Sequence, residues 1–230
     1  MTKQKDFKLH ALMCVTGGYM GTYSLLRCTE GFGAAQTANL IYTVTSLMDG
    51  NLILFLLHLL GLFFYMAGIE TYIFVIHKTA WNPQKWALIT ELCCIFVIGL
   101  LPKTHSQYLC LYAVCYMLAA QWSVFHGACG YTSATIFSTN NVKQFSLAIG
   151  NYFYDKEREQ ARKAEFFGFT LLFYHTGVAL VFLFWHVFRQ DSVWVCLIPV
   201  LTAAGIVYGI VNESKIEHGG NKNGYESLRE

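Results

Sequence analysis

Residues 62–71 read LFFYMAGIET, and residues 171–180 read LLFYHTGVAL. Each stretch has a leucine, a Phe-Tyr pair two residues later, two variable residues and then a glycine. His175 stands in the second copy where Met66 stands in the first. Both copies lie inside long apolar runs, so the repetition indicates an internal duplication of a helix that a membrane could surround.

The composition of the chain supports a membrane environment. Of 230 residues, 55% are hydrophobic and only 13% are charged, whereas about a quarter of the residues of a soluble domain are charged. The formal net charge is +2 and the basic residues are scattered between the apolar runs. This pattern argues against nucleic acid as a partner and predicts the lipid bilayer instead.

Six apolar runs are long enough, or nearly so, to cross about 30 Å of hydrocarbon as helices. They predict an all-α fold with six transmembrane helices in one membrane domain over residues 1–212. Residues 213–230 contain too few apolar side chains to pack and are predicted to form a disordered cytoplasmic tail. The six runs are residues 9–26, 51–77, 86–101, 108–126, 164–188 and 193–211.

The basic residues predict the orientation of these spans. All lysines and arginines except Arg27, Lys103 and Arg189 lie in the N-terminal segment, the second loop, the fourth loop or the tail. Basic residues are enriched on the cytoplasmic side of membrane proteins. We therefore expect a multi-pass protein of the plasma membrane with both termini in the cytoplasm.

The segments after the first and fourth spans also match each other. Each contains Thr-x-Asn followed by a half-apolar stretch and a Gly-Asn pair. The matching residues are Thr37, Asn39, Gly50 and Asn51 in one segment, and Thr139, Asn141, Gly150 and Asn151 in the other.

The two halves, residues 9–101 and 108–211, therefore each read as span, short segment, span, span. Three spans per half is an odd number, which predicts inverted repeats like those of secondary transporters. The short segments then enter the membrane as re-entrant or interrupted helices. The alternative is that both are amphipathic helices lying on the membrane surface.

Four stretches resemble the YoaK family of bacterial membrane proteins over about residues 9–211. They read GGYMGTYSLL, QTANLIYTVTSLMDGN, YMAGIET and AAQWSVF. Gly21, Ala38 and Trp122 depart from the residues usual in that family. Because its members are described as membrane proteins of unknown function and sometimes as presumed permeases, the resemblance implies an architecture more than an activity.

Polar residues of the short segments and of the spans form the candidate substrate site. Inverted-repeat transporters bind their substrates near the midplane, where interrupted segments of the two halves meet. His175 lies near the centre of its span, and imidazole can carry a proton near neutral pH; a packing role for this side chain is the alternative. The expected substrate-binding residues are Thr37, Asn39, Gln121, Thr139, Asn141 and His175.

Two carboxylates lie inside predicted spans, Glu70 in the second and Glu91 in the third. A charged side chain at that depth costs about 3 kcal/mol. A pair of close carboxylates can share a proton, which makes these residues candidates for proton coupling. In the alternative interpretation, Glu91 reaches the membrane interface and Glu70 hydrogen-bonds a neighbouring group.

Glycines predict where helices approach closely. Gly17 and Gly21 lie on one helix face, and small residues four apart permit close packing of helices in membranes. Gly68 and Gly177, the glycines of the duplicated stretch, are expected to have the same role.

Together these features predict a transporter or facilitator for an unknown small solute. The alternative is a non-transporting membrane module that binds a protein partner or lipid. No Gly-x-Ser-x-Gly or His-Glu-x-x-His motif occurs in a span, so an enzyme is not expected. The histidines lack metal-ligand spacing, and we expect neither metal nor other cofactor; a homo-oligomer is compatible with the sequence.

Overall fold

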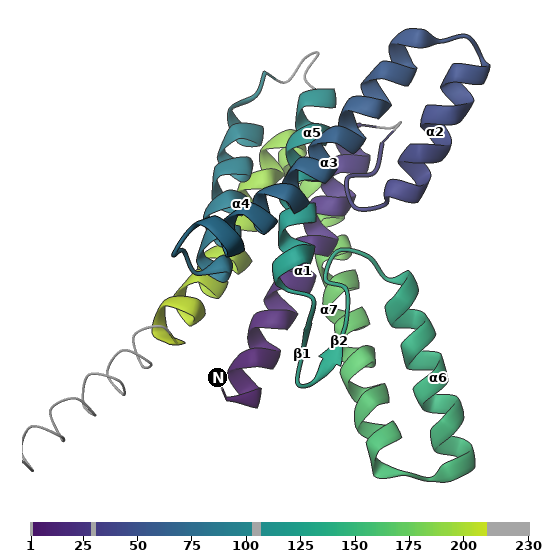
Figure 1. Ribbon diagram of the computed structural model, residues 1–230, viewed down its shortest axis with the longest axis vertical. Helices are drawn as coiled ribbons and strands as arrows, with labels where there is room; N and C mark the ends of the chain where they lie inside the picture. Colours follow the sequence, from purple (N-terminus) through teal and green to yellow (C-terminus); the bar gives the residue numbers. More distant parts are fainter. Residues whose placement is uncertain (1, 29–30, 103–106, 211–230) are drawn as a thin grey trace, which may run out of the picture.

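The computed structural model describes residues 2–28, 31–102 and 107–210, and this part of the chain is predominantly helical (Figure 1). Residues 197–210 continue as a helix after the last named element. The predicted tail, residues 213–230, lies outside the described residues. The named elements are α1 (Lys3–Arg27), α2 (Gln36–Met48), α3 (Leu52–Lys78), α4 (Pro83–Leu100), α5 (Gln107–Val124), β1 (Gly127–Ala128), β2 (Tyr131–Thr132), α6 (Thr139–Asp155), α7 (Arg158–Phe188) and the 3-10 helix η1 (Arg189–Cys196).

Three helical stretches of the described chain are long and apolar enough to cross a membrane: α3, α4 and Arg158–Ile210. Many of their outward side chains are large and apolar; Phe63 and Leu183, for example, are each 63% exposed. Large apolar side chains in contact with water would be unfavourable in such numbers. These surfaces are therefore compatible with a membrane protein.

Helices α1 and α5, also expected as spans, lie at the centre of the molecule and are largely buried. A helix that is enclosed by protein does not need a uniformly apolar surface, because neighbouring helices can satisfy its polar groups. Thr16 in α1 and Gln121 in α5 are both fully buried. Accordingly, α1 and α5 are not among the three described stretches that are apolar enough to cross a membrane.

Close backbone contact fixes the crossing of α1 and α7. A Cβ atom on Gly177 would overlap the Val15 carbonyl oxygen and lie 2.8 Å from the Tyr19 nitrogen, both in α1. On the other side of the crossing, a Cβ atom on Gly18 would overlap the Tyr174 carbonyl oxygen. Only glycine permits the two backbones to approach this closely.

The crossing of α3 and α5 also depends on close backbone contact at a glycine. The Cβ position of Gly68 lies 2.5 Å from the Tyr116 carbonyl oxygen and 3.3 Å from the Ala120 nitrogen. In both crossings the glycine therefore meets the carbonyl of one residue and the nitrogen of the residue four positions later on the partner helix.

The short helices α2 and α6 pack beside α3 and α7 respectively, at opposite ends of the molecule (Figure 1). Gly50 ends α2 with a φ of 74°, and the Asn51 side chain then caps α3 by accepting a hydrogen bond from the Leu54 nitrogen. Gly150 has no such role, because it lies inside α6 and the chain turns only at Lys156, with a φ of 56°. The Gly-Asn pairs that match in sequence therefore differ in structure.

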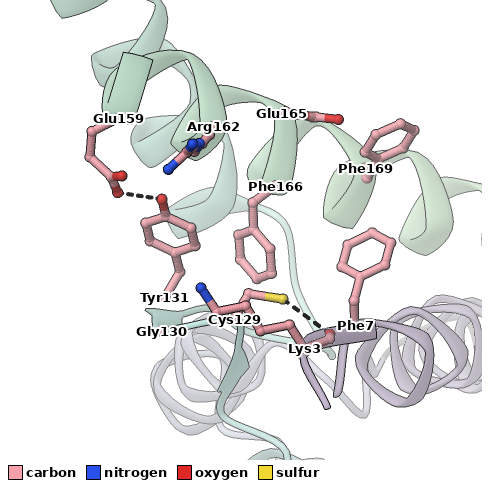
Figure 2. A pocket seen from close by; sticks show the side chains of 10 residues that line it. All are labelled: Lys3, Phe7, Cys129, Gly130, Tyr131, Glu159, Arg162, Glu165, Phe166 and Phe169. Atoms are coloured by element: carbon pink, nitrogen blue, oxygen red, sulfur yellow. Dashed lines mark hydrogen bonds between the residues drawn. The ribbon is translucent and has the colours of Figure 1, made fainter. Parts of the chain in front are cut away.

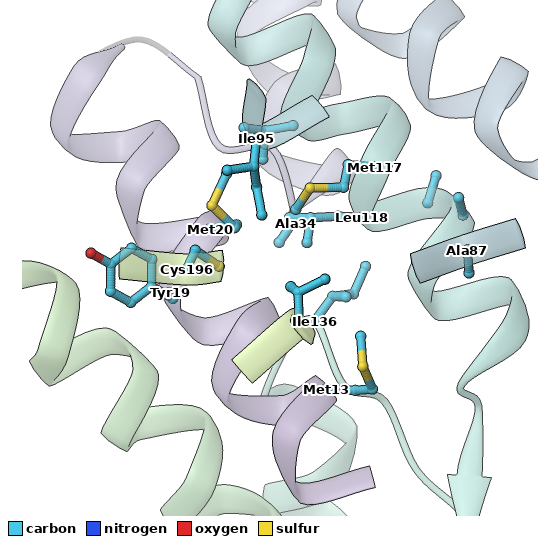
Figure 3. Close-up of a cluster of buried hydrophobic side chains, with 14 of the residues drawn as sticks. Met13, Tyr19, Met20, Ala34, Ala87, Ile95, Met117, Leu118, Ile136 and Cys196 are labelled. Carbon is cyan, nitrogen blue, oxygen red and sulfur yellow. The ribbon is translucent and has the colours of Figure 1, made fainter. Parts of the chain in front are cut away.

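The main hydrophobic core surrounds α1 and α5. Figure 3 shows Met20 of α1 beside Ile95 of α4 and Met117 of α5, with Cys196 at the end of η1 near Met20 and Met13 of α1 lower in the view. All five side chains are fully buried. Methionine is flexible and fills irregular gaps, which suits a core formed where several helices cross at different angles.

Candidate functional site

An asparagine fastens the chain segment that precedes α2. The Asn39 side-chain nitrogen donates to the Phe32 carbonyl at 2.9 Å, and the Phe32 backbone nitrogen donates to the Asn39 side-chain oxygen at 3.0 Å. Phe32 and Ala34 of this segment lie against the Cβ position of Gly21 in α1. The amide of Asn39 is thus used to hold the loop against α1, and Gly21 makes room for the loop rather than for another helix.

The equivalent asparagine fastens the segment before α6. The Asn141 side-chain nitrogen donates to the Ala134 carbonyl at 2.7 Å, and the Ala134 nitrogen donates to the Asn141 oxygen at 3.3 Å. The Ser133 hydroxyl donates to the same oxygen at 3.3 Å. In both halves the asparagine therefore clamps the backbone of the residue seven positions earlier.

Gln121 connects this second segment to α1. Its side-chain nitrogen donates to the Met13 carbonyl at 2.8 Å and to the Thr135 hydroxyl at 3.0 Å. Its side-chain oxygen is buried and has no hydrogen-bond partner in the described chain. Gly17 is required beside this contact, because a Cβ atom there would overlap the Thr135 carbonyl oxygen.

His10 extends the same group of polar side chains toward the start of α1. One ring nitrogen, Nε2, lies 3.1 Å from the Ser133 hydroxyl, and the ring stacks on Phe166 at 5.5 Å between centroids. The other nitrogen, Nδ1, is buried without a partner among the described residues. Beside His10 is a cavity of about 30 Å³ that Asp6 and Gln84 also line, which has room for a water molecule.

We name these five side chains the polar junction: His10, Gln121, Ser133, Thr135 and Asn141. Each is at most 2% exposed. Burial of polar groups is costly unless they are paired, and two atoms of the junction, Gln121 Oε1 and His10 Nδ1, are buried without a hydrogen-bond partner in the described chain.

The remaining residues of the predicted substrate site lie outside the polar junction. Thr37 and Thr139 are exposed in the first turns of α2 and α6. His175 is exposed on α7, where its Nδ1 atom lies 2.8 Å from the Leu171 carbonyl of its own helix. The fold therefore brings Gln121 and Asn141 together and leaves these three residues, and Asn39 in its clamp on Phe32, apart from them.

The two carboxylates of the spans have different environments. Glu91 is fully buried, and neither of its oxygens has a hydrogen-bond partner in the described chain. Its electrostatic neighbours include the thiols of Cys94 and Cys196. Glu70 is exposed on α3. Glu91 thus does not reach the surface, and the two carboxylates do not form a hydrogen-bonded pair.

Sequence analysis did not identify His10, Ser133 and Thr135 as candidate site residues. Ser133 and Thr135 stand a few residues before the Thr-x-Asn motif of the second half, and His10 lies at the start of an apolar run. Nothing in their local spacing distinguishes them from loop residues. Only the packing of residues 133–136 against α1 brings them to Gln121.

A second feature is a cavity of about 720 Å³ at the end of the molecule where α1 and α7 begin. Figure 2 shows it between the first turns of these helices and the β1–β2 hairpin. We name it the terminal cavity. Its lining residues are Lys3, Phe7, Cys129, Gly130, Tyr131, Glu159, Arg162, Glu165, Phe166 and Phe169.

Hydrogen bonds and charges order the hairpin side of the terminal cavity. The Tyr131 hydroxyl donates to the Glu159 carboxylate. Burial, and next this bond to Glu159, raise the pKa of Tyr131 to about 12. Burial, and next the Asp6 carboxylate, raise the pKa of the Cys129 thiol, whereas the Lys3 ammonium lowers it. Asp6 also accepts a hydrogen bond from the Cys129 nitrogen at 2.7 Å.

The comparison with protein families gives one match, which covers residues 9–207. The matched family is described as "Protein of unknown function (DUF1275)". The chain belongs to this family. Comparisons with curated proteins and with solved structures give no match. For this DUF1275 member, membership therefore identifies relatives without assigning an activity.

The charges around Cys129 lead to a testable expectation for this DUF1275 member. Replacing Lys3 with glutamine removes the cation that lowers the thiol pKa. Since the thiolate is the nucleophile, modification of Cys129 by N-ethylmaleimide at pH 8 should become slower. The rate for Cys129 is the labelling rate of the protein minus the rate that remains when Cys129 is replaced by serine.

The matched control is Lys8→Gln, which removes an exposed cation of the same helix and should leave the rate unchanged. Faster labelling in Lys3→Gln would mean that the substitution loosens the hairpin, and it would contradict the electrostatic explanation.

Proposed function

We propose that the protein is a transporter or facilitator for a small solute, with six membrane-spanning helices in the plasma membrane and both termini in the cytoplasm. Residues 9–101 and 108–211 form its two inverted repeats. Three helical stretches apolar enough to cross a membrane support the membrane location. The distribution of lysine and arginine supports the orientation.

Repeated contacts support the two inverted repeats. The first helix of each half packs against the second long helix of the other half, α1 against α7 and α5 against α3. Gly177 and Gly68 make these two crossings with the same pair of backbone contacts, and Asn39 and Asn141 make the same clamp. The α2–α3 and α6–α7 pairs lie at opposite ends of the molecule (Figure 1), as expected for halves of opposite orientation.

The polar junction is the observation that carries the proposal of transport. It lies between α1, α5 and the interrupted segment before α6, the kind of place where inverted-repeat transporters bind substrate. Gln121 Oε1 accepts no hydrogen bond in the described chain, although it is buried. A small solute with an O–H or N–H group would supply the missing donor.

The junction is closed in this conformation, since Gly17 leaves no space between α1 and the Thr135 backbone. Alternating access then requires that residues 133–138 and α1 separate on one side at a time. Glu91, buried without a partner, is the residue we propose for proton coupling. Glu70, which is exposed on α3, is the weaker candidate for that role.

Replacing Gln121 with leucine tests this proposal. Leucine has a similar volume but removes both the donor to Thr135 and the unpaired acceptor. In the wild type, a solute that binds the folded state raises the unfolding midpoint, by about 2.7 kcal/mol of stability at a hundred times its dissociation constant. We expect one class of solutes to raise the midpoint of the wild type in detergent and not that of Gln121→Leu.

The control is Ser123→Ala in the same helix. The Ser123 hydroxyl donates to the Ala119 carbonyl of the preceding turn, and this variant should keep the response. The solute identified should then cross vesicles that contain the wild type. A solute that stabilises Gln121→Leu as strongly as the wild type would exclude the polar junction as its binding site.

The tight packing of α1 against residues 133–136 also favours a second candidate, a membrane module that binds a partner or lipid and transports nothing. Such a module needs no moving junction. Flux measurements separate the two functions: a solute that binds at the junction but never crosses the bilayer would favour the module.

A further inference from the structure

We propose that the terminal cavity binds the phosphate group of an anionic phospholipid, with Arg162 and Lys3 as its ligands. The proposal needs a membrane at this end of the molecule but no transport, so it stands whether the junction moves or not.

Two cations point into the same part of the terminal cavity. Figure 2 shows the Arg162 guanidinium, from the first turns of α7, on one side of the space beside Tyr131, and the Lys3 side chain, from the start of α1, reaching toward that space from the other side. Neither side chain forms an ion pair with a described carboxylate. A guanidinium can hold phosphate through two parallel hydrogen bonds, and an ammonium adds a third donor group.

Two carboxylates also line the cavity, so its formal charges balance, but they do not occupy the space between the cations. Glu159 accepts the hydrogen bond of the Tyr131 hydroxyl. The Glu165 carboxylate lies at the opposite rim and points toward Phe169 in Figure 2. The two carboxylates therefore lie away from the space between Lys3 and Arg162, where a further anion can be accommodated.

Aromatic rings form the other half of the cavity. Phe7 packs edge-on against Phe166 at 6.3 Å and against Phe169 at 6.1 Å between ring centroids. Phe169 is 41% exposed and continues the cavity onto the apolar outer face of α7. A site with cations on one side and an apolar surface on the other fits an amphiphile, whereas a free phosphate would leave the apolar half in water.

In the orientation proposed above, the cavity faces the cytoplasmic leaflet, which is rich in anionic lipids. Further cations lie nearby without lining the cavity: Lys156 at the end of α6, and Arg158 and Lys163 in the first turns of α7. Basic residues at the membrane surface attract anionic lipids by about 1 kcal/mol each. These residues would raise the local lipid concentration, and Arg162 and Lys3 would supply the specific contacts.

The test uses the full-length protein in a neutral detergent and measures its unfolding midpoint against added phosphatidylglycerol, with phosphatidylcholine as the neutral comparison. We expect phosphatidylglycerol to raise the midpoint of the wild type and phosphatidylcholine to leave it unchanged. In Arg162→Gln and in Lys3→Gln, the lipid concentration needed for the same shift should rise by about tenfold, which corresponds to about 1.4 kcal/mol.

Arg158→Gln is the matched control, because Arg158 has the same charge, begins the same helix and does not line the cavity. Because Arg158→Gln removes only a general surface attraction, it should raise the phosphatidylglycerol concentration needed for the shift by clearly less than Arg162→Gln does. Equal losses in Arg158→Gln and Arg162→Gln would overturn the proposal in favour of general surface attraction.

Two further outcomes bear on the source of the phosphate and on folding. A shift produced by inorganic phosphate or glycerol 3-phosphate alone would overturn the assignment to lipid. Without lipid, both variants must keep the unfolding midpoint of the wild type. If Arg162→Gln has a lower midpoint, the test depends on Lys3→Gln alone. An unchanged lipid response in Lys3→Gln would then overturn the proposal.

Discussion

Replacing Gly177 with alanine is expected to destabilise the protein by about 3 kcal/mol, at the upper end of the cost of overpacking. The added methyl group would overlap the Val15 carbonyl oxygen and lie 2.8 Å from the Tyr19 nitrogen. Both obstacles are backbone atoms, so no side-chain rotation relieves them. Helices α1 and α7 must separate, and the packing of the whole crossing weakens. The measurement is the unfolding midpoint of the full-length protein in detergent.

Gly150→Ala is the matched control, because Gly150 also lies inside a helix but nothing lies within 4 Å of its Cβ position. Alanine there should leave the midpoint unchanged or raise it, since glycine in a helix costs about 0.5–1 kcal/mol relative to alanine. If both variants unfold at the same temperature, close backbone contact does not determine the α1–α7 crossing.

Replacing Asn141 with alanine is the second substitution with a large expected effect, a loss of about 3 kcal/mol. It leaves the nitrogen and the carbonyl of Ala134 without the amide that pairs both of them. Ala134 is only 4% exposed, and each buried polar group that loses its partner costs about 1–3 kcal/mol. Asn39→Ala should have a similar effect through Phe32, and both are measured by the unfolding midpoint.

The neighbouring Asn140→Ala is a close control, because Asn140 has the same side chain but is exposed at the start of α6. Its midpoint should remain within about 0.5 kcal/mol of the wild type, as for most surface substitutions. An Asn141 variant as stable as the Asn140 variant would show that the clamp does not stabilise the loop.

The sequence was sufficient to predict the long helices. The apolar runs at residues 51–77 and 164–188 correspond to α3 and to most of α7, because runs of this length and continuity are too long for strands and favour helices. A hydrophobic run is a local property of the sequence, so it predicts a helix without information about which segments pack against it in the fold. The membrane location and the six-span topology that we drew from the same runs remain predictions.

The candidate site was predicted only in part. Gln121 and Asn141 were expected near each other and are joined through Ser133 and Thr135, whereas His175 lies exposed on α7. A histidine in the middle of an apolar run has a definite height along its helix. Its direction around the helix axis depends on which face meets a neighbour, and the run itself is apolar on all sides.

The sequence alone therefore determined which segments are helices, that the stretch around Gly68 is repeated around Gly177, and that Asn39 and Asn141 occupy equivalent positions. The tertiary structure decided that the two glycines make crossings between halves, that the two asparagines clamp backbone, and that His10 joins Gln121 beside residues 133–136. The physical reason is range: helix formation and apolar surface depend on neighbours in the chain, whereas the contact of Gly177 with Val15 and the hydrogen bond of Gln121 to Met13 join distant parts of the chain. The two asparagine clamps each span seven residues, but they depend on a loop conformation that packing against other helices fixes.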